Sequence, residues 1–142
     1  MRALLDVNVL IALLDAGHVH HARASQWLTS EIGHGWASCP LTQNGCVRIM
    51  SQPAYPQALP VAAVAARLAQ AAAHPAHRFL PDDYSLLGNE AVHWSHVLGH
   101  RQITDAYLLG LAVRHACRFV SFDARVDLAC VAGARPEHVL VL

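Results

Sequence analysis

Three aspartates stand beside apolar stretches of the sequence, where an acidic side chain is uncommon. Asp6 follows the first apolar residues of the chain and precedes the apolar run 9–14. Asp105 lies near the start of the apolar segment 103–113, and Asp123 closes a later apolar stretch. Buried acids are seldom found without partners, so each of these carboxylates is a candidate for chemistry.

The residues around Asp6 predict a strand that is followed by a helix. Residues 2–5 are expected to form a short buried strand with Asp6 at its carboxyl end. Asn8 then caps a helix that starts at Val9. Because ligands of open α/β sheets bind at the carboxyl ends of the strands, Asp6 is expected at a functional edge.

The other two aspartates are expected at the same edge as Asp6. Asp123 ends a predicted strand, and Asp105 lies in the first turn of the helix that leads into it, where the helix dipole favours an ionised carboxylate. In a parallel sheet the carboxyl ends of strands and the amino ends of helices lie on one side. We therefore expect the three carboxylates to meet in one cleft.

Carboxylates that converge repel one another unless one is protonated or a cation holds them together. The sequence places no arginine in that role, so a hard divalent ion, Mg²⁺ or Mn²⁺, is the expected solution. Such an ion keeps several waters, binds a phosphodiester, activates a water and stabilises the leaving oxygen. Thr104 and Ser121 stand beside two of the acids and could orient a ligand or a water.

Strands and helices alternate along the chain, which predicts a parallel sheet between layers of helices. We expect a single domain, residues 1–142, folded as an α/β protein: a three-layer α/β/α sandwich with a mainly parallel central sheet. The expected strands are 2–5, 36–39, 77–80, 118–123 and 139–141. The expected helices are 9–14, 18–30, 43–51, 61–73, 90–98, 103–113 and 126–131.

The composition is that of a compact globular protein, with 54% hydrophobic and only 14% charged residues. The formal net charge is zero, so no broad basic surface for nucleic acid is expected. All ten basic residues are arginines. The four cysteines show no metal-binding spacing and are expected to be reduced, mostly buried thiols of a cytoplasmic protein: Cys39, Cys46, Cys117 and Cys130.

The apolar beginning of the chain differs from a signal peptide and from a membrane span. Asp6 and Asn8 interrupt it, and the longest clean apolar run, 9–14, is short for either purpose. A cytoplasmic protein with no membrane partner is therefore expected.

Four stretches, in this order, resemble the successive motifs of the PIN-domain ribonucleases, and most closely those of the VapC toxins. They are LLDVNVL at 4–10, TQNGCVRI at 42–49, ITDAYL at 103–108 and VSFD at 120–123. The resemblance covers essentially the whole chain with suitable spacing. Each motif is weak alone, and the four together are specific.

This resemblance implies an endoribonuclease that depends on Mg²⁺ or Mn²⁺ and cuts structured RNA such as transfer or ribosomal RNA. It also implies a homodimer that a small cognate antitoxin holds inactive. Asp6, Asp105 and Asp123 take three of the family's acidic, metal-binding and catalytic positions. Asn44 stands where the family usually has a glutamate, which predicts weaker metal binding. Arg48 resembles a family position and is expected to be structural or to contact the RNA or the antitoxin.

Two other functions are consistent with parts of the sequence. A phosphohydrolase of the haloacid-dehalogenase type also begins with a strand that ends in Asp, but it needs a second Asp where Asn8 stands here. A PIN-like module that binds RNA or protein with weakened catalysis is favoured by Asn44 and by the neutral net charge. Metal-dependent cleavage by the purified protein separates these alternatives.

Overall fold

The computed structural model describes residues 1–88 and 90–142. Five strands form one sheet in the order β3-β2-β1-β4-β5, and every pair of neighbours in it is parallel. The strands are β1 (Ala3–Leu5), β2 (Trp36–Ser38), β3 (His77–Phe79), β4 (Arg118–Ser121) and β5 (Val139–Val141). The α-helices are α1 (Val7–Leu14), α2 (His21–Glu31), α3 (Pro40–Met50), α4 (Val61–Ala72) and α5 (Ile103–Arg114).

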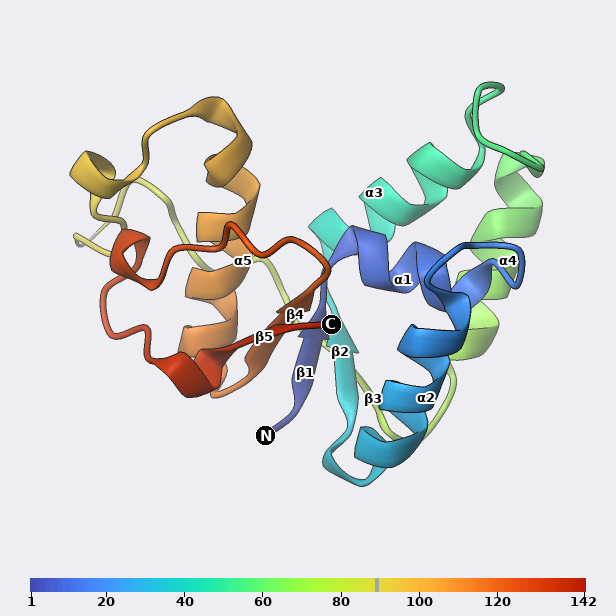
Figure 1. Cartoon of the computed structure of the whole chain (residues 1–142), viewed down its shortest axis with the longest axis horizontal. Coiled ribbons are helices and arrows are strands. Elements are labelled where there is room, and N and C mark those ends of the chain that lie inside the picture. Colours follow the sequence, from blue (N-terminus) through green and yellow to red (C-terminus); the bar gives the residue numbers. More distant parts are fainter. Residues whose placement is uncertain (89) are drawn as a thin grey trace.

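Helices cover both faces of the sheet, with α1 to α4 on one side and α5 on the other (Figure 1). Successive residues of a strand point to opposite faces, so β1 contributes to both layers. Ala3 and Leu5 pack among α1 to α4, whereas Leu4 packs in the layer of α5. Because the central strands are covered on both faces, most of their residues are buried and apolar. The three-layer α/β/α architecture predicted from the sequence is confirmed.

Two further sequence expectations concern cysteines and membranes. All four cysteines are buried and free, as predicted for structural thiols. Among residues 1–88 and 90–142, no helix has the length and apolar character needed to span a bilayer.

The expected boundaries next to two of the aspartates were wrong. Helix α1 begins at Val7, two residues earlier than expected, and Asp6 rather than Asn8 is its N-cap. The Asp6 carboxylate accepts a hydrogen bond from the Val7 N–H at 2.7 Å, which satisfies one donor of the first turn. Strand β4 ends at Ser121, so Asp123 lies two residues beyond the strand instead of at its end.

The helices expected at 90–98 and 126–131 were also wrong. Each segment contains only a 3₁₀ turn, Trp94–His96 in the first and Leu128–Cys130 in the second. The two segments instead pair with each other through an antiparallel bridge between Val92 and Val131. Cross-segment hydrogen bonds of this kind occupy backbone groups that a helix would use within one segment.

Candidate active site

The order of the strands creates one position where a ligand is expected. Strand β1 lies between β2 and β4, and the chain continues from β1 to β2 on one side of this point and from β4 to β5 on the other. The carboxyl ends of β1 and β4 therefore form a topological switch point, which is where open α/β sheets bind ligands. Asp6 directly follows β1, and Asp123 lies just beyond β4.

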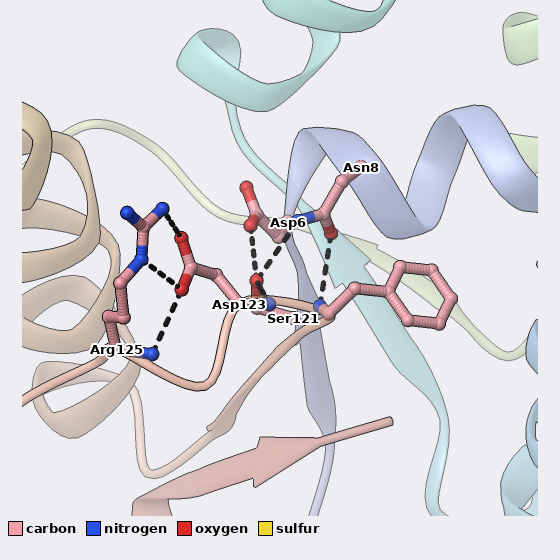
Figure 2. Close-up of polar contacts among 6 residues, drawn as sticks. Asp6, Asn8, Ser121, Asp123 and Arg125 are labelled. Atoms are coloured by element: carbon pink, nitrogen blue, oxygen red, sulfur yellow. Dashed lines mark hydrogen bonds and ion pairs between the residues drawn. The ribbon is translucent and has the colours of Figure 1, made fainter.

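Asp6 is the most deeply placed acid of the site, with 8% of its surface exposed. One carboxylate oxygen accepts the Val7 N–H, and the other accepts the Ser121 hydroxyl at 2.6 Å (Figure 2). Burial raises the pKa of Asp6, and the nearby charge of Asp123 raises it further, while these hydrogen bonds oppose the shift. Asp6 is therefore held in one orientation at the floor of the site.

Ser121 connects the residues that surround Asp6. Its fully buried hydroxyl donates to Asp6 and accepts the Asn8 side-chain amide at 3.1 Å and the Asp123 N–H at 3.0 Å. The side-chain Oδ1 of Asn8 in turn accepts a hydrogen bond from the Phe122 N–H at 3.4 Å. Ser121 and Asn8, which the sequence proposed as supporting residues, thus tie the end of β4 to the start of α1 (Figure 2).

Asp105 lies in the first turn of α5, as expected, and is half-buried. Burial raises its pKa to about 6, and the carboxylates of Asp6 and Asp123 contribute to the rise. No described residue donates a hydrogen bond to Asp105, so its carboxylate lies near like charges without a partner of its own. The neighbouring Thr104 is exposed and forms no side-chain hydrogen bond within the described part of the chain.

Asp123 is paired with an arginine from the same loop. Arg125 donates to one oxygen of Asp123 through Nε at 2.9 Å and to the other through Nη2 at 2.6 Å, and its backbone N–H adds a third bond at 2.9 Å. Figure 2 shows the Asp123 carboxylate turned toward this guanidinium. Arg125 lowers the pKa of Asp123 to about 2. The pKa values of Asp105 and Asp123 are thus shifted in opposite directions: Asp105 holds a proton more tightly and Asp123 less tightly.

A pocket of about 110 Å³ lies at the outer side of this site. It is lined by Arg101, Gln102, Asp105, Asp123 and Arg125. A larger groove of about 710 Å³ runs between α3 and α4, but four of its nine lining residues are alanines, and it contains none of the three aspartates. The chemistry therefore favours the smaller pocket as the site.

The three aspartates suit a hard divalent ion by their chemistry, because carboxylate oxygens are the ligands that Mg²⁺ and Mn²⁺ prefer. Among the described residues, however, no three His, Cys, Asp or Glu side chains are arranged to hold a metal ion. Both oxygens of Asp123 face Arg125, and both oxygens of Asp6 accept hydrogen bonds. Asp105 has no such partner. The chemistry of the donor set fits the ion, and in this structure the Asp123 carboxylate is paired with Arg125.

Two residues that the sequence proposed as support lie elsewhere on α3. Asn44 is exposed, lines the groove toward α4 and forms no hydrogen bond with the three aspartates. Arg48, one turn later, is also exposed. The contact of α3 with the start of α1 is made by Gly45, where an added Cβ would lie 2.7 Å from a methyl group of Val7. This close contact leaves no room for a side chain at position 45.

The expectation that no arginine neutralises the acids was wrong, and Arg125 is the residue that it missed. The signal was present in the sequence as Asp-Ala-Arg directly after the predicted strand. In a tight turn, residues two apart can share backbone and side-chain hydrogen bonds, as Asp123 and Arg125 do here. Because the strand was predicted to end at Asp123, this turn was not foreseen.

Comparison with known proteins gives the family. Residues 3–132 match the model of the PIN domain. The chain is 49% identical to Ribonuclease VapC44 of Mycobacterium tuberculosis over 142 residues, which cover all of both proteins. It is 46% identical to Ribonuclease VapC38 of the same organism over 125 residues, which cover 87% of this chain and 86% of that protein.

A solved structure supports the fold at much lower sequence identity. The crystal structure of Mycobacterium tuberculosis VapC20, described as a Sarcin-Ricin loop cleaving toxin, superposes with a TM-score of 0.59 at 18% identity. The match covers 94% of this chain and 99% of that one. On the strength of its match to the PIN domain and its identity to the curated relatives, the chain belongs to the PIN-domain family and, within it, to the VapC ribonuclease toxins.

Proposed function

We propose that this protein is an endoribonuclease toxin whose cleavage of RNA depends on Mg²⁺ or Mn²⁺ held by Asp6, Asp105 and Asp123. The observation that carries the proposal is the state of Asp105. A half-buried carboxylate with no hydrogen-bond donor and a pKa of about 6 lies near two other acids. An arrangement of this kind is unfavourable by itself and becomes favourable when a cation binds.

Each aspartate has a distinct part in this proposal. Asp6, fixed by Ser121 and the start of α1, provides the inner ligand whose position does not change. Asp105, from the first turn of α5, provides the outer ligand and must be deprotonated to bind. Asp123 completes the set after it is released from Arg125. When bound, the ion supplies an acidified water and neutralises charge on the phosphodiester.

The proposed substrate is structured RNA, such as transfer or ribosomal RNA. The relatives that match this chain are named ribonucleases, which supports RNA as the class of substrate. With a formal net charge of zero, the protein gains little from counterion release on any nucleic acid. Choice among RNAs then depends on a few arginines beside the pocket and on shape, which favours a folded RNA.

The proposed partners are a small cognate antitoxin and a second copy of the chain, with the cytoplasm as the site of action. Membership of the VapC toxins supports the antitoxin and the homodimer. The chemistry of the pocket supports the antitoxin further, because an arginine from a peptide can occupy an acidic site in place of a metal. The match to the PIN domain over residues 3–132 favours a nuclease over an aspartate-dependent phosphohydrolase.

The experiment is induction of the chain alone, of its Asp105→Asn variant, and of the chain together with the small protein encoded next to it. We expect growth arrest and new RNA ends with the wild type, and neither with the variant or the pair. Sequencing of the new ends identifies the RNA and the cleavage site. If wild type and variant leave growth and RNA equally intact, the non-catalytic RNA- or protein-binding function takes the place of this one.

A further inference from the structure

Arg125 is the only cation that hydrogen-bonds to any of the three aspartates within residues 1–88 and 90–142. Its guanidinium contacts both oxygens of Asp123, which are the atoms that a divalent ion needs. The bidentate arrangement is the strong form of the arginine–carboxylate pair. In this arrangement a metal and Arg125 compete for the same carboxylate.

The Arg125 side chain is held by Asp123 alone among the described residues. It is 68% exposed, and its guanidinium has no hydrogen-bond partner except Asp123 among the described residues. It stands in the loop between β4 and the 3₁₀ turn Leu128–Cys130, outside any helix or strand. Because the pair is exposed, water screens its attraction, so a divalent ion can displace it.

The pocket offers Arg125 a second role. Its lining includes Arg101 from the 3₁₀ turn His100–Gln102, which no described acid pairs with. Asp105 and Asp123 line the same pocket. Two guanidinium groups lie beside two prospective metal ligands. A phosphodiester suits such a site, because its negatively charged oxygens can contact a metal and the arginines at the same time.

We propose that Arg125 exchanges partners: it neutralises Asp123 in the metal-free protein and, when a divalent ion takes Asp123, it binds a phosphate oxygen of the RNA beside Arg101. The exchange reduces the excess of negative charge at the site. Without metal, the guanidinium offsets one of three carboxylates. With metal and RNA, the ion offsets the carboxylates and the guanidinium offsets the phosphate. This inference rests on the proposed metal-dependent function and adds the residue that links metal binding to substrate binding.

The first test is a titration of the full-length protein with Mn²⁺, in which free Mn²⁺ is followed by electron paramagnetic resonance. Arg125→Ala is compared with wild type and with Arg135→Ala. Arg135 is a matched control, because it is equally exposed at 66% and also pairs with an acid two residues away, Glu137, at 2.9 Å. We expect Arg125→Ala to bind Mn²⁺ about three to ten times more tightly than wild type, and Arg135→Ala to bind as wild type does.

The second test uses dimethyl phosphate as a minimal phosphodiester and follows the enhancement of its ³¹P relaxation by bound Mn²⁺. With all three proteins saturated in Mn²⁺, we expect dimethyl phosphate to bind at least about threefold more weakly to Arg125→Ala than to the other two. Tighter metal binding combined with weaker phosphate binding is the signature of an exchange. A residue that only fixes the loop would not change the two affinities in opposite directions.

The outcomes separate this inference from the proposed function. If Arg125→Ala binds Mn²⁺ as wild type does, or more weakly, the exchange is wrong and the metal-dependent function stands. If the variant binds Mn²⁺ more tightly but dimethyl phosphate equally well, Arg125 only competes with the metal and the phosphate contact is wrong. If wild type binds no Mn²⁺, the metal-dependent function fails and the exchange fails with it.

Discussion

The two edges of the sheet differ in what their charged side chains contact. At the amino edge, one guanidinium nitrogen of Arg2 donates to the carbonyl oxygens of Trp36 at 3.2 Å and Ala76 at 2.6 Å. Arg118, at the start of β4, donates to the carbonyl oxygen of Glu137 at 3.0 Å. Each of these cations donates to carbonyl oxygens of other segments, so the charges stabilise the connections between strands.

At the carboxyl edge, three carboxylates lie near one another. Asp6 and Asp105 have raised pKa values, and part of each rise comes from the neighbouring carboxylates. Only Asp123 has a cationic partner among the described residues. The amino edge therefore contributes to stability, whereas the carboxyl edge costs stability in the metal-free protein. Such a cost is typical of a site that is completed by a ligand.

The largest expected effect is on RNA cleavage by Asp105→Asn. Loss of one metal ligand should lower the rate of cleavage at least about a hundredfold, because both the ion and the water it acidifies are displaced. The same substitution should not lower the free energy of unfolding of the metal-free protein, because it removes repulsion. A gel assay with Mg²⁺ and a urea melt measure the two effects. A variant that cleaves at the wild-type rate would place the chemistry elsewhere.

The opposite pattern is expected at the amino edge. Arg2→Ala removes a charged donor from two backbone carbonyls and should lower the free energy of unfolding by about 1.5–3 kcal/mol. Cleavage per folded molecule should stay unchanged. Arg23→Ala, which removes an exposed arginine from α2, is the matched control and should leave both quantities unaltered. If Arg2→Ala and Arg23→Ala had the same free energy of unfolding, the amino edge would not be stabilised by its arginine, and the two edges would not differ in this respect.

The third prediction is that the metal-free protein loses stability as the pH rises. Because the pKa of Asp105 is raised from 3.8 to about 6, the folded state binds more protons than the unfolded state between about pH 4 and pH 6. The free energy of unfolding should therefore fall by about 1–2 kcal/mol over this range, after an allowance for solvent screening. Asp123, with its pKa lowered to about 2, acts in the opposite direction and only below about pH 4.

Urea melts at several pH values in the presence of a chelator measure this slope. Asp6, whose pKa is also raised, should contribute in the same direction. In Asp105→Asn the part of the slope that comes from Asp105 should disappear. Equal slopes in wild type and in this variant would show that the Asp105 carboxyl is not under like-charge repulsion.

The smallest effect is expected at Asn44. On the sequence alone, Asn44→Glu adds a charged ligand and tightens metal binding. In the structure Asn44 is exposed on the side of α3 that faces α4, where solvent and salt screen its charge from the aspartates. We therefore expect the affinity for Mn²⁺ to change by less than about twofold. A tenfold gain in the affinity for Mn²⁺ would show that the side chain at position 44 takes part in the metal site.

The apolar strands and the acids at their ends could be predicted from the sequence because both depend on local patterns. The buried run before Asp6, the apolar helix after Asp105 and the strand before Asp123 together gave the parallel sheet and the edge where the acids gather. The pair between Asp123 and Arg125 could not be foreseen, because it depends on where β4 ends. The false helices at 90–98 and 126–131 have a different cause, because the segment that each one pairs with is distant in sequence.

The most direct test of the three-aspartate site is a titration of Mn²⁺ into wild type, Asp6→Asn, Asp105→Asn and Asp123→Asn at one pH and ionic strength. Asp127→Asn is the matched control, because Asp127 belongs to the same loop and only caps the 3₁₀ turn that follows. We predict that each of the three variants binds Mn²⁺ at least about tenfold more weakly than wild type, and that the control binds as wild type does. Wild-type affinity in all three variants would contradict a metal site built from these aspartates.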